Sequence, residues 1–225
     1  MTDTPRFELF SYWRSSAVYR VRVAMNLKGV PRRETNVDID GGEQLGDAYR
    51  AVNPLGGIPA LVDHGLGAGA LPMTQSLAIL EFLDETHPQP PLLPADPHGR
   101  ARVRSIAQML TADTHPLVTP RVRKVLATTA GFDADAWRAW QSQWFGAGMR
   151  AVEQRLATEP ATGRFCHGDA VTLADICLAS LFTVMRVFRI DFDDIPTCKR
   201  IMAECEAMEA FAAADPWRQA GAPKA

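Results

Sequence analysis

A proline-rich segment divides this chain into two parts with different patterns. Residues 87–97 contain five prolines in eleven positions, which excludes a continuous helix or strand. Short apolar runs alternate with stretches of helical spacing before this segment, whereas helical spacing alone recurs after it. The chain therefore predicts two domains, over residues 1–86 and 99–225, joined by a linker over 87–98.

The second part shows only the helical period. Val103, Ile106 and Leu110 recur on one helical face. An aromatic stripe follows at the same spacing, formed by Trp137, Trp140, Trp144 and Phe145. We interpret this stripe as packing surface, because most such stripes are. Thr172 and Asp175 have the spacing of a capping box, with Asp in place of the usual Glu or Gln. The second domain is thus expected to be all helical.

Composition excludes several classes of function. The 225 residues carry a net charge of −2 with a pI near 6.2, which favours neither nucleic acid nor a membrane surface as a partner. No apolar run is long enough to span a bilayer, and the polar N-terminus does not resemble a signal peptide. The cysteines show neither Cys-x-x-Cys spacing nor the His partners of a zinc site, so we expect no metal and a reducing cytoplasmic location. They are Cys166, Cys177, Cys198 and Cys205.

A strand-to-helix turn near the N-terminus carries two adjacent hydroxyls. Residues 7–10 read as a strand, and the spacing over 18–25 predicts a helix that ends at Gly29. Ser15 and Ser16 stand between them, where backbone N–H groups and the helix dipole favour an anion. An ordinary serine N-cap would have the same sequence, so this segment alone leaves both interpretations open.

Two further segments place polar groups beside strands. Residues 53–62 run from an Asn-Pro loop into an apolar strand, whose Ile-Pro step suits a strand start because proline cannot donate to a ladder. A short apolar piece over 70–73 precedes Gln75 and Ser76, which open another helix. The order strand, helix, strand, strand, helix predicts a small α/β domain.

Five segments keep the order and spacing of one known family: 11–16, 20–24, 53–54, 58–61 and 75–79. They resemble the zeta class of glutathione S-transferases, which includes the maleylacetoacetate isomerases, and the resemblance covers nearly the whole chain. It implies an α/β thioredoxin-like N-terminal domain that binds glutathione, followed by an all-α C-terminal domain. It also implies that a cis peptide bond precedes Pro59, a form that costs only about 0.5–1 kcal/mol over trans.

The resemblance assigns roles to single residues. Ser15 is expected to stabilise the glutathione thiolate and Ser16 to support it, so both are candidate catalytic residues. The other matched positions contact glutathione in the family, with Ile58 acting through its backbone and His115 reaching in from the second domain. They are Gln44, Ile58, Gln75, Ser76 and His115. His115 taken alone would equally suit a surface or interface histidine.

One hydroxyl and a helix N-terminus are sufficient in magnitude for the thiolate role. A thiol with a pKa of about 8.5 is only ~3% ionised at pH 7, and a pKa of about 6.5 raises this to roughly three quarters. The two pKa units correspond to about 2.7 kcal/mol. A charge-assisted hydrogen bond contributes ~1.5–3 kcal/mol and a helix N-terminus up to ~1 kcal/mol, so no general base is required.

Two positions depart from the family pattern. Ala17 replaces a cysteine that the family commonly has beside the glutathione sulfur, which is expected to tune the site without abolishing it. Val187 stands where the family often has an arginine that meets the substrate carboxylate. Candidates for this role are Arg14, Arg121, Arg186 and Arg189, because the planar guanidinium of arginine can donate two parallel hydrogen bonds to one carboxylate. We favour Arg14 and Arg121, because one helical step rotates Arg186 by about 100° from the family position.

These observations predict a glutathione-dependent enzyme that isomerises maleylacetoacetate to fumarylacetoacetate in aromatic amino-acid catabolism. Alternatives within the family are maleylpyruvate isomerisation and glutathione transfer to α-haloacids. An alternative of another class is a non-catalytic interaction domain, against which the retained Ser15, Gln75 and Ser76 argue. The expected partners are glutathione, a small unsaturated dicarboxylate and, by resemblance, a second copy of the chain in a homodimer.

Overall fold

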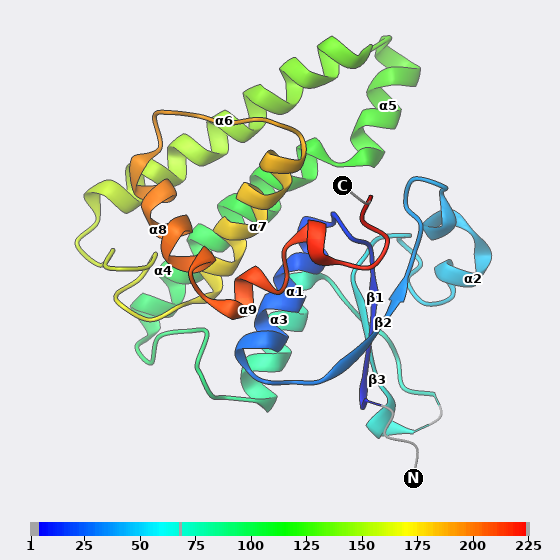
Figure 1. Ribbon diagram of the computed structural model, residues 1–225, viewed down its shortest axis with the longest axis horizontal. Helices are drawn as coiled ribbons and strands as arrows, with labels where there is room; N and C mark the ends of the chain where they lie inside the picture. Colours follow the sequence, from blue (N-terminus) through cyan, green and yellow to red (C-terminus); the bar gives the residue numbers. More distant parts are fainter. Residues whose placement is uncertain (1–4, 68, 224–225) are drawn as a thin grey trace. The chain divides into compact units, whose positions relative to one another are not determined.

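The computed structural model describes residues 5–67 and 69–223, which divide into two compact units (Figure 1). The first comprises the described residues up to Pro91 together with those from Met208 onward, and the second runs from Leu92 to Ala207. The C-terminal segment thus packs with the first unit, whereas the sequence pattern placed all of 99–225 in the helical domain. Its Trp217 ring lies 5.1 Å from that of Trp13, centroid to centroid.

The first unit is built on a four-stranded mixed sheet with the strand order β2-β1-β3-β4. β1 (Phe7–Ser11) pairs in parallel with β2 (Arg32–Asn36) and antiparallel with β3 (Ala60–Asp63). β3 pairs antiparallel with the short β4 (Met73–Thr74). This is the mixed α/β domain that the resemblance implied.

Four helices accompany this sheet. They are α1 (Ser16–Leu27), α2 (Asp47–Arg50), α3 (Ser76–Thr86) and α9 (Glu209–Ala212). α1 and α3 pack side by side on one face of the sheet, while α2 lies toward the other face (Figure 1). α9 packs against α1, where the Asn26 side chain donates to the Ala210 carbonyl at 2.9 Å.

The sequence pattern predicted three strands in this unit, and β2 is the strand that it missed. β2 consists entirely of polar residues and lies at an edge of the sheet, so it lacks the apolar alternation that reveals a strand. Polar contacts replace apolar ones across the β1–β2 pair. Arg33 and Thr35 both donate to the Glu8 carboxylate, each at 2.6 Å.

α1 begins and ends where the sequence predicted. Ser15 is its N-cap, and Gly29 follows the helix with a φ of +62°, a conformation that glycine adopts without steric cost. Arg22 in the middle of α1 is only 2% exposed. It pairs with Glu34 of β2 at 2.7 Å and also donates to the Tyr12 and Trp13 carbonyls, so its role is structural.

Lys28 joins the end of α1 to the end of α3. Its side chain is fully buried, and its ammonium group donates to Asp84 at 2.9 Å. The same group donates to the carbonyls of His87 at 2.6 Å and Pro90 at 2.9 Å. Burial of a cation requires such complete pairing, so Lys28 fixes the start of the proline-rich segment within the first unit.

The second unit is all helical, as expected. Its main helices are α4 (Pro97–Gln108), α5 (Pro120–Ala130), α6 (Ala134–Thr158), α7 (Leu173–Val187) and α8 (Pro196–Glu206). α7 packs against both α4 and α8, and twelve of its fifteen residues are buried. It is therefore the central helix of this unit. Within the described residues, no helix is long and apolar enough to cross a membrane.

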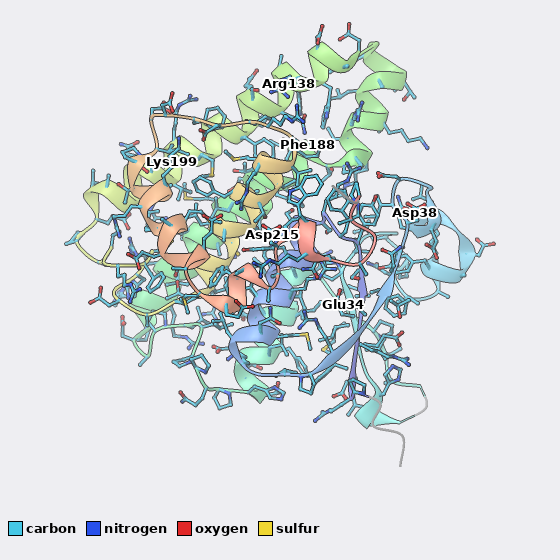
Figure 2. The ribbon with its side chains drawn as sticks, viewed as in Figure 1. Glu34, Asp38, Arg138, Phe188, Lys199 and Asp215 are labelled. Carbon is cyan, nitrogen blue, oxygen red and sulfur yellow. The ribbon has the colours of Figure 1, made fainter. Side chains whose placement is uncertain are left out.

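Both ends of α7 are held by side chains. Asp175 is completely buried and accepts hydrogen bonds from the Thr172 N–H, the Thr172 hydroxyl and the Cys166 N–H, each at 2.7 Å. The helix start predicted from Thr172 and Asp175 is thus confirmed. At the other end, Arg138 of α6 donates to the carbonyls of Phe188 at 3.0 Å and Arg189 at 2.8 Å (Figure 2).

A π-helical turn, Met109–Thr114, follows α4 and was not predicted. The Thr114 hydroxyl donates to the Met109 carbonyl at 2.7 Å, five residues back. Gly148 of α6 makes room for this turn, since a Cβ there would lie 2.0 Å from the Thr114 hydroxyl oxygen. Such turns insert one extra residue per helical turn and are frequent near functional sites. His115 follows immediately.

Candidate functional site

Four segments that carry predicted site residues meet at one end of the sheet in the first unit. Ser11 at the end of β1 receives the N–H of Val37, just after β2, at 2.8 Å. Ala60 at the start of β3 pairs with both Phe10 of β1 and Thr74 of β4. The serine turn, the loop after β2, the Ile-Pro step and the start of α3 therefore lie at the same end of the sheet.

Ser15 caps α1 and keeps its hydroxyl hydrogen available. Its backbone is extended, with φ −72° and ψ 115°, and its Oγ accepts the Val18 N–H at 3.3 Å. The cap uses the oxygen as an acceptor, which leaves the O–H free to donate to an anion. The two interpretations of this serine are thus compatible. Ser16, the first helical residue, is only 3% exposed and less accessible than its half-buried neighbour.

The Ile58–Pro59 peptide bond is cis, as the resemblance implied. Two side chains fix the chain directly before it: the Tyr49 hydroxyl and the Asn53 amide donate to the Gly57 carbonyl at 2.8 and 2.6 Å. Burial raises the pKa of Tyr49, which keeps its hydroxyl protonated as a donor. Ile58 is therefore held in place by residues outside the predicted site set.

Gln75 adopts an unusual backbone conformation at the start of α3. Its φ is +69°, in the region that non-glycine residues seldom occupy. Such strain costs on the order of 1–3 kcal/mol and clusters at ligand sites. Ser76 begins the helix and is 7% exposed. The first-turn N–H groups of an α-helix suit a carboxylate, which supports the predicted role of Gln75 and Ser76.

Gln44 lies in the loop after β2 with an unsatisfied acceptor. Its amide nitrogen donates to the Ile39 carbonyl at 3.3 Å, whereas its Oε1 is shielded from solvent and has no hydrogen-bond partner among the described residues. A buried unpaired acceptor costs on the order of 1–3 kcal/mol. A peptide ligand such as glutathione offers N–H donors of the kind this oxygen lacks, so the residue fits the ligand.

Asp40 connects the same loop to the serine turn, and sequence reasoning missed it. Its Oδ2 accepts the Tyr12 hydroxyl and its Oδ1 accepts Arg14, both at 2.5 Å. The Arg14 guanidinium also lies 5.7 Å from the Trp13 ring centroid. One edge of Arg14, a favoured candidate for the substrate carboxylate, is therefore already engaged. No local pattern links position 40 to position 12, because the sheet brings them together.

The remaining candidates belong to the second unit. His115 opens a short 3-10 turn after the π-helical turn, and Arg121 is exposed near the start of α5. Arg186 is exposed on α7 and pairs with Glu206 of α8 at 2.8 Å. Arg189 has a φ of +54° just after α7. Arg14 and Arg186 thus both have a carboxylate partner, and the preference for Arg14 and Arg121 over Arg186 stays a prediction.

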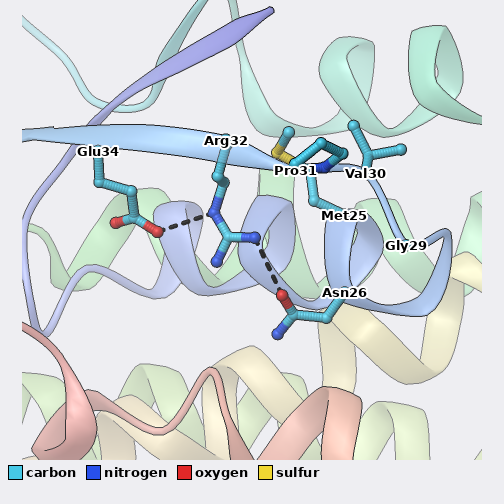
Figure 3. Close-up of a pocket in the computed structure, with 7 residues that line it drawn as sticks. All are labelled: Met25, Asn26, Gly29, Val30, Pro31, Arg32 and Glu34. Carbon is cyan, nitrogen blue, oxygen red and sulfur yellow. Dashed lines mark hydrogen bonds and ion pairs between the residues drawn. The ribbon is translucent and has the colours of Figure 1, made fainter. Parts of the chain in front are cut away.

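A hollow of about 420 Å³ lies at the opposite end of α1 from Ser15, and no predicted site residue lines it (Figure 3). Its only basic lining side chain, Arg32, donates to the Glu34 carboxylate at 2.8 Å and to the side-chain Oδ1 of Asn26 at 2.9 Å. The positive charge of Arg32 is therefore already paired with the Glu34 carboxylate.

The four cysteines are free and buried. Burial raises the pKa of Cys166, Cys198 and Cys205, so these thiols stay protonated and are poor nucleophiles. Across residues 5–67 and 69–223 there is no group of three His, Cys, Asp or Glu side chains suited to a metal ion.

Comparison with known proteins identifies the class to which this fold and site belong. Residues 14–86 match the model of the glutathione S-transferase N-terminal domain. The maleylpyruvate isomerase of Ralstonia sp is 40% identical over 94% of this chain and 98% of its own. The maleylacetoacetate isomerase of Rattus norvegicus is 36% identical over 96% of this chain and 94% of its own. The chain belongs to the glutathione S-transferase family, in its zeta class.

Solved structures agree with this assignment. A maleylacetoacetate isomerase from Methylobacterium extorquens AM1, with bound malonate and glutathione, is 46% identical and superposes with a TM-score of 0.92, covering 96% of this chain and 100% of that one. A zeta-class maleylpyruvate isomerase is 39% identical with a TM-score of 0.90 and the same coverage. The thioredoxin-like and all-helical fold classes predicted from sequence are confirmed.

Proposed function

We propose that this protein is a glutathione-dependent isomerase that converts maleylacetoacetate to fumarylacetoacetate. The observation that carries the proposal is Ser15, whose oxygen caps α1 while its hydrogen remains available for a thiolate. The names of the relatives at 36–40% identity support the same chemistry.

We assign glutathione to the end of the sheet where the predicted segments meet. Gln75 and Ser76 receive its γ-glutamyl carboxylate at the N-terminus of α3, and Ile58 pairs through its backbone with the cysteinyl part. The unpaired acceptor of Gln44 receives an N–H donor. His115 contributes from the second unit.

Bound glutathione supplies a sulfur nucleophile for reversible addition to the cis double bond, which permits rotation and, after elimination, leaves glutathione unchanged. The protein's part is to hold the reactants together, to donate the Ser15 hydrogen bond, and to neutralise the substrate carboxylates with Arg121 and the free edge of Arg14. Ser16 supports the turn. None of these roles requires a metal or a general base.

Maleylpyruvate isomerisation is the second candidate, favoured by the 40% identity to an isomerase of that name. Assays of maleylacetoacetate and maleylpyruvate side by side, with and without glutathione, distinguish the two. A higher kcat/KM for maleylpyruvate than for maleylacetoacetate would make maleylpyruvate the preferred substrate. If calorimetry finds no binding at millimolar glutathione, the enzymatic proposal itself is wrong, and a docking role gains support.

We further propose a homodimer in the cytoplasm. The family resemblance supports the dimer, and the four free, buried cysteines suit a reducing compartment. Light scattering at micromolar concentration checks the dimer, for which we expect about twice the chain mass of 24.7 kDa. A mass equal to that of one chain would contradict it.

A further inference from the structure

We propose that Asp40 is a positioning residue that holds the loop over residues 37–46 against the serine turn and thereby presents Gln44 to glutathione. The proposal rests on the proposed function, because it requires glutathione to bind at this end of the sheet. Each carboxylate oxygen of Asp40 has its own partner on the turn: Oδ2 accepts from the Tyr12 hydroxyl and Oδ1 from Arg14.

Hydrogen bonds within the loop couple the position of Asp40 to that of Gln44. Asp38 (Figure 2) accepts the Gly41 N–H on its carboxylate at 3.0 Å and the Glu43 N–H on its carbonyl at 2.9 Å. In return, the Glu43 carboxylate accepts the Asp38 N–H at 2.7 Å. Asp40 lies within the turn that these hydrogen bonds close between Asp38 and Glu43, and Gln44 is the next residue after that turn. Contacts that hold Asp40 in place therefore also restrict the backbone position of Gln44.

Gln44 is also confined by the segment that precedes the Ile-Pro step. A Cβ at Gly56 would lie 2.8 Å from the Gln44 carbonyl oxygen, and Gly56 has a φ of +65°, so only glycine permits this close approach. The segment carrying Gly56 leads directly to the fixed Gly57 carbonyl. The Gln44 backbone is thus limited both by the contacts of Asp40 within its own loop and by the close approach of Gly56, and loss of the Asp40 contacts removes the first of these two restraints.

The two contacts of Asp40 differ in environment. Tyr12 is 7% exposed, whereas the Arg14 side chain is 31% and the Asp40 side chain 55% exposed. Exposed ion pairs contribute little, so the bond to the Tyr12 hydroxyl is expected to anchor the loop more than the pair with Arg14. An aspartate serves both donors at once, because an ionised carboxylate has two acceptor oxygens.

The test is a mutant cycle read by glutathione binding. Calorimetry measures the Kd of the wild type, Asp40→Ala, Gln44→Ala and the double variant. We expect Asp40→Ala to raise the Kd about fivefold, and the double variant to bind no more weakly than Gln44→Ala, because contacting residues in one path are not additive. The kcat of Asp40→Ala, measured at saturating glutathione and substrate, should change less than its Kd for glutathione, since Asp40 itself is proposed to touch neither reactant.

Matched variants separate positioning from a general loss of structure. Asp194→Ala breaks an ion pair of the same 2.5 Å length and similar exposure in the second unit, and should leave the Kd unchanged. Tyr12→Phe keeps the ring and should raise the Kd, while Asp40→Asn keeps one acceptor and should raise it less than Asp40→Ala. These two variants decide the question if urea unfolding shows Asp40→Ala to be unfolded.

Four results would overturn the inference. An unchanged Kd in Asp40→Ala and Tyr12→Phe, or additive effects in the cycle, would refute the role of Asp40 while leaving glutathione binding intact. A Kd change matched by Asp194→Ala would assign the effect to net charge. Absence of glutathione binding by the wild type would refute the proposed function and this inference together.

Discussion

At Ser15 one hydroxyl serves the fold and, in the proposed function, the chemistry. The cap uses its lone pair and the thiolate uses its hydrogen, so the two roles do not compete. Arg22, on the same helix, serves the fold alone. It is buried among Glu34 and two carbonyls and is therefore unavailable to a ligand.

Ser15→Ala should lower turnover by about 10²-fold, because the hydroxyl is expected to supply about 2.7 kcal/mol to the thiolate. It should also cost about 0.5–2 kcal/mol of stability as the lost cap of α1. Steady-state kinetics and urea unfolding measure the two effects separately. Ser16→Ala is the control and should cost less turnover. Equal rates for Ser15→Ala and the wild type would move the role to Ser16 or the backbone.

Arg121→Met should raise the KM for the substrate by roughly tenfold, as expected for losing ~1.5–3 kcal/mol of charged hydrogen bonding. The Kd for glutathione should change little. Arg186→Met is the matched control, since Arg186 already pairs with Glu206. If Arg186→Met alone raised the KM, Arg186 would be the carboxylate-binding residue and the preference for Arg121 would be wrong.

Helices and strands whose own residues carry a local sequence signal were predictable, whereas those stabilised by contacts with distant residues were not. Ser15, Gly29 and Asp175 mark helix ends by local chemistry, and the structure confirms each of them. β2 was not predicted because its stabilising partners, Glu8 and Arg22, lie on other elements. The π-helical turn depends on Gly148, more than thirty residues away, so no local pattern reveals it.

The residues of the candidate site also fall into those that the sequence indicated and those that only the folded structure reveals. The residues that the family motif carries, such as Ser15, Gln75 and the cis Pro59, were named from sequence. Their roles remain predictions. Asp40 and Tyr49 support the site only through folded geometry, so the sequence alone offered no signal for them.

The junction of α1 and α3 depends on Lys28. Lys28→Met should lower the free energy of unfolding by about 3–5 kcal/mol, because it removes the buried ammonium group that pairs with Asp84 and donates to two carbonyls. Urea unfolding measures this loss. Lys199→Met, which removes an exposed pair with Asp191, is the control and should cost at most about 1 kcal/mol. Similar losses for both variants would contradict a structural role for Lys28.

Acid should destabilise the whole molecule through both units. Despite desolvation, hydrogen bonds from Arg22 lower the pKa of Glu34, and the backbone N–H groups of Cys198 and Thr197 at the start of α8 lower that of Glu153. Carboxyls with a lowered folded pKa stabilise the fold above their unfolded pKa of about 4.3, and this stability is lost as the pH falls through the folded pKa. Burial raises the pKa of Asp175, which opposes the trend.

Urea midpoints measured from pH 3 to pH 6, a range chosen to bracket the carboxyl titration at about 4.3, should therefore rise with pH. Glu34→Gln should make this rise shallower, because it removes one of the linked carboxyls. Glu209→Gln removes an exposed carboxyl at the start of α9 and is the control for the loss of one negative charge. A slope that is the same in the wild type and Glu34→Gln would contradict the linkage.

β2 and β4 leave the sheet with two edges that discourage an added strand. An open edge presents unpaired N–H and C=O groups that template aggregation, and charged side chains or very short strands block such pairing. β2 carries Arg32, Arg33 and Glu34 in a row, while β4 offers only Met73 and Thr74. The polar composition that hid β2 from sequence reasoning thus protects the protein from self-association through its sheet at high concentration.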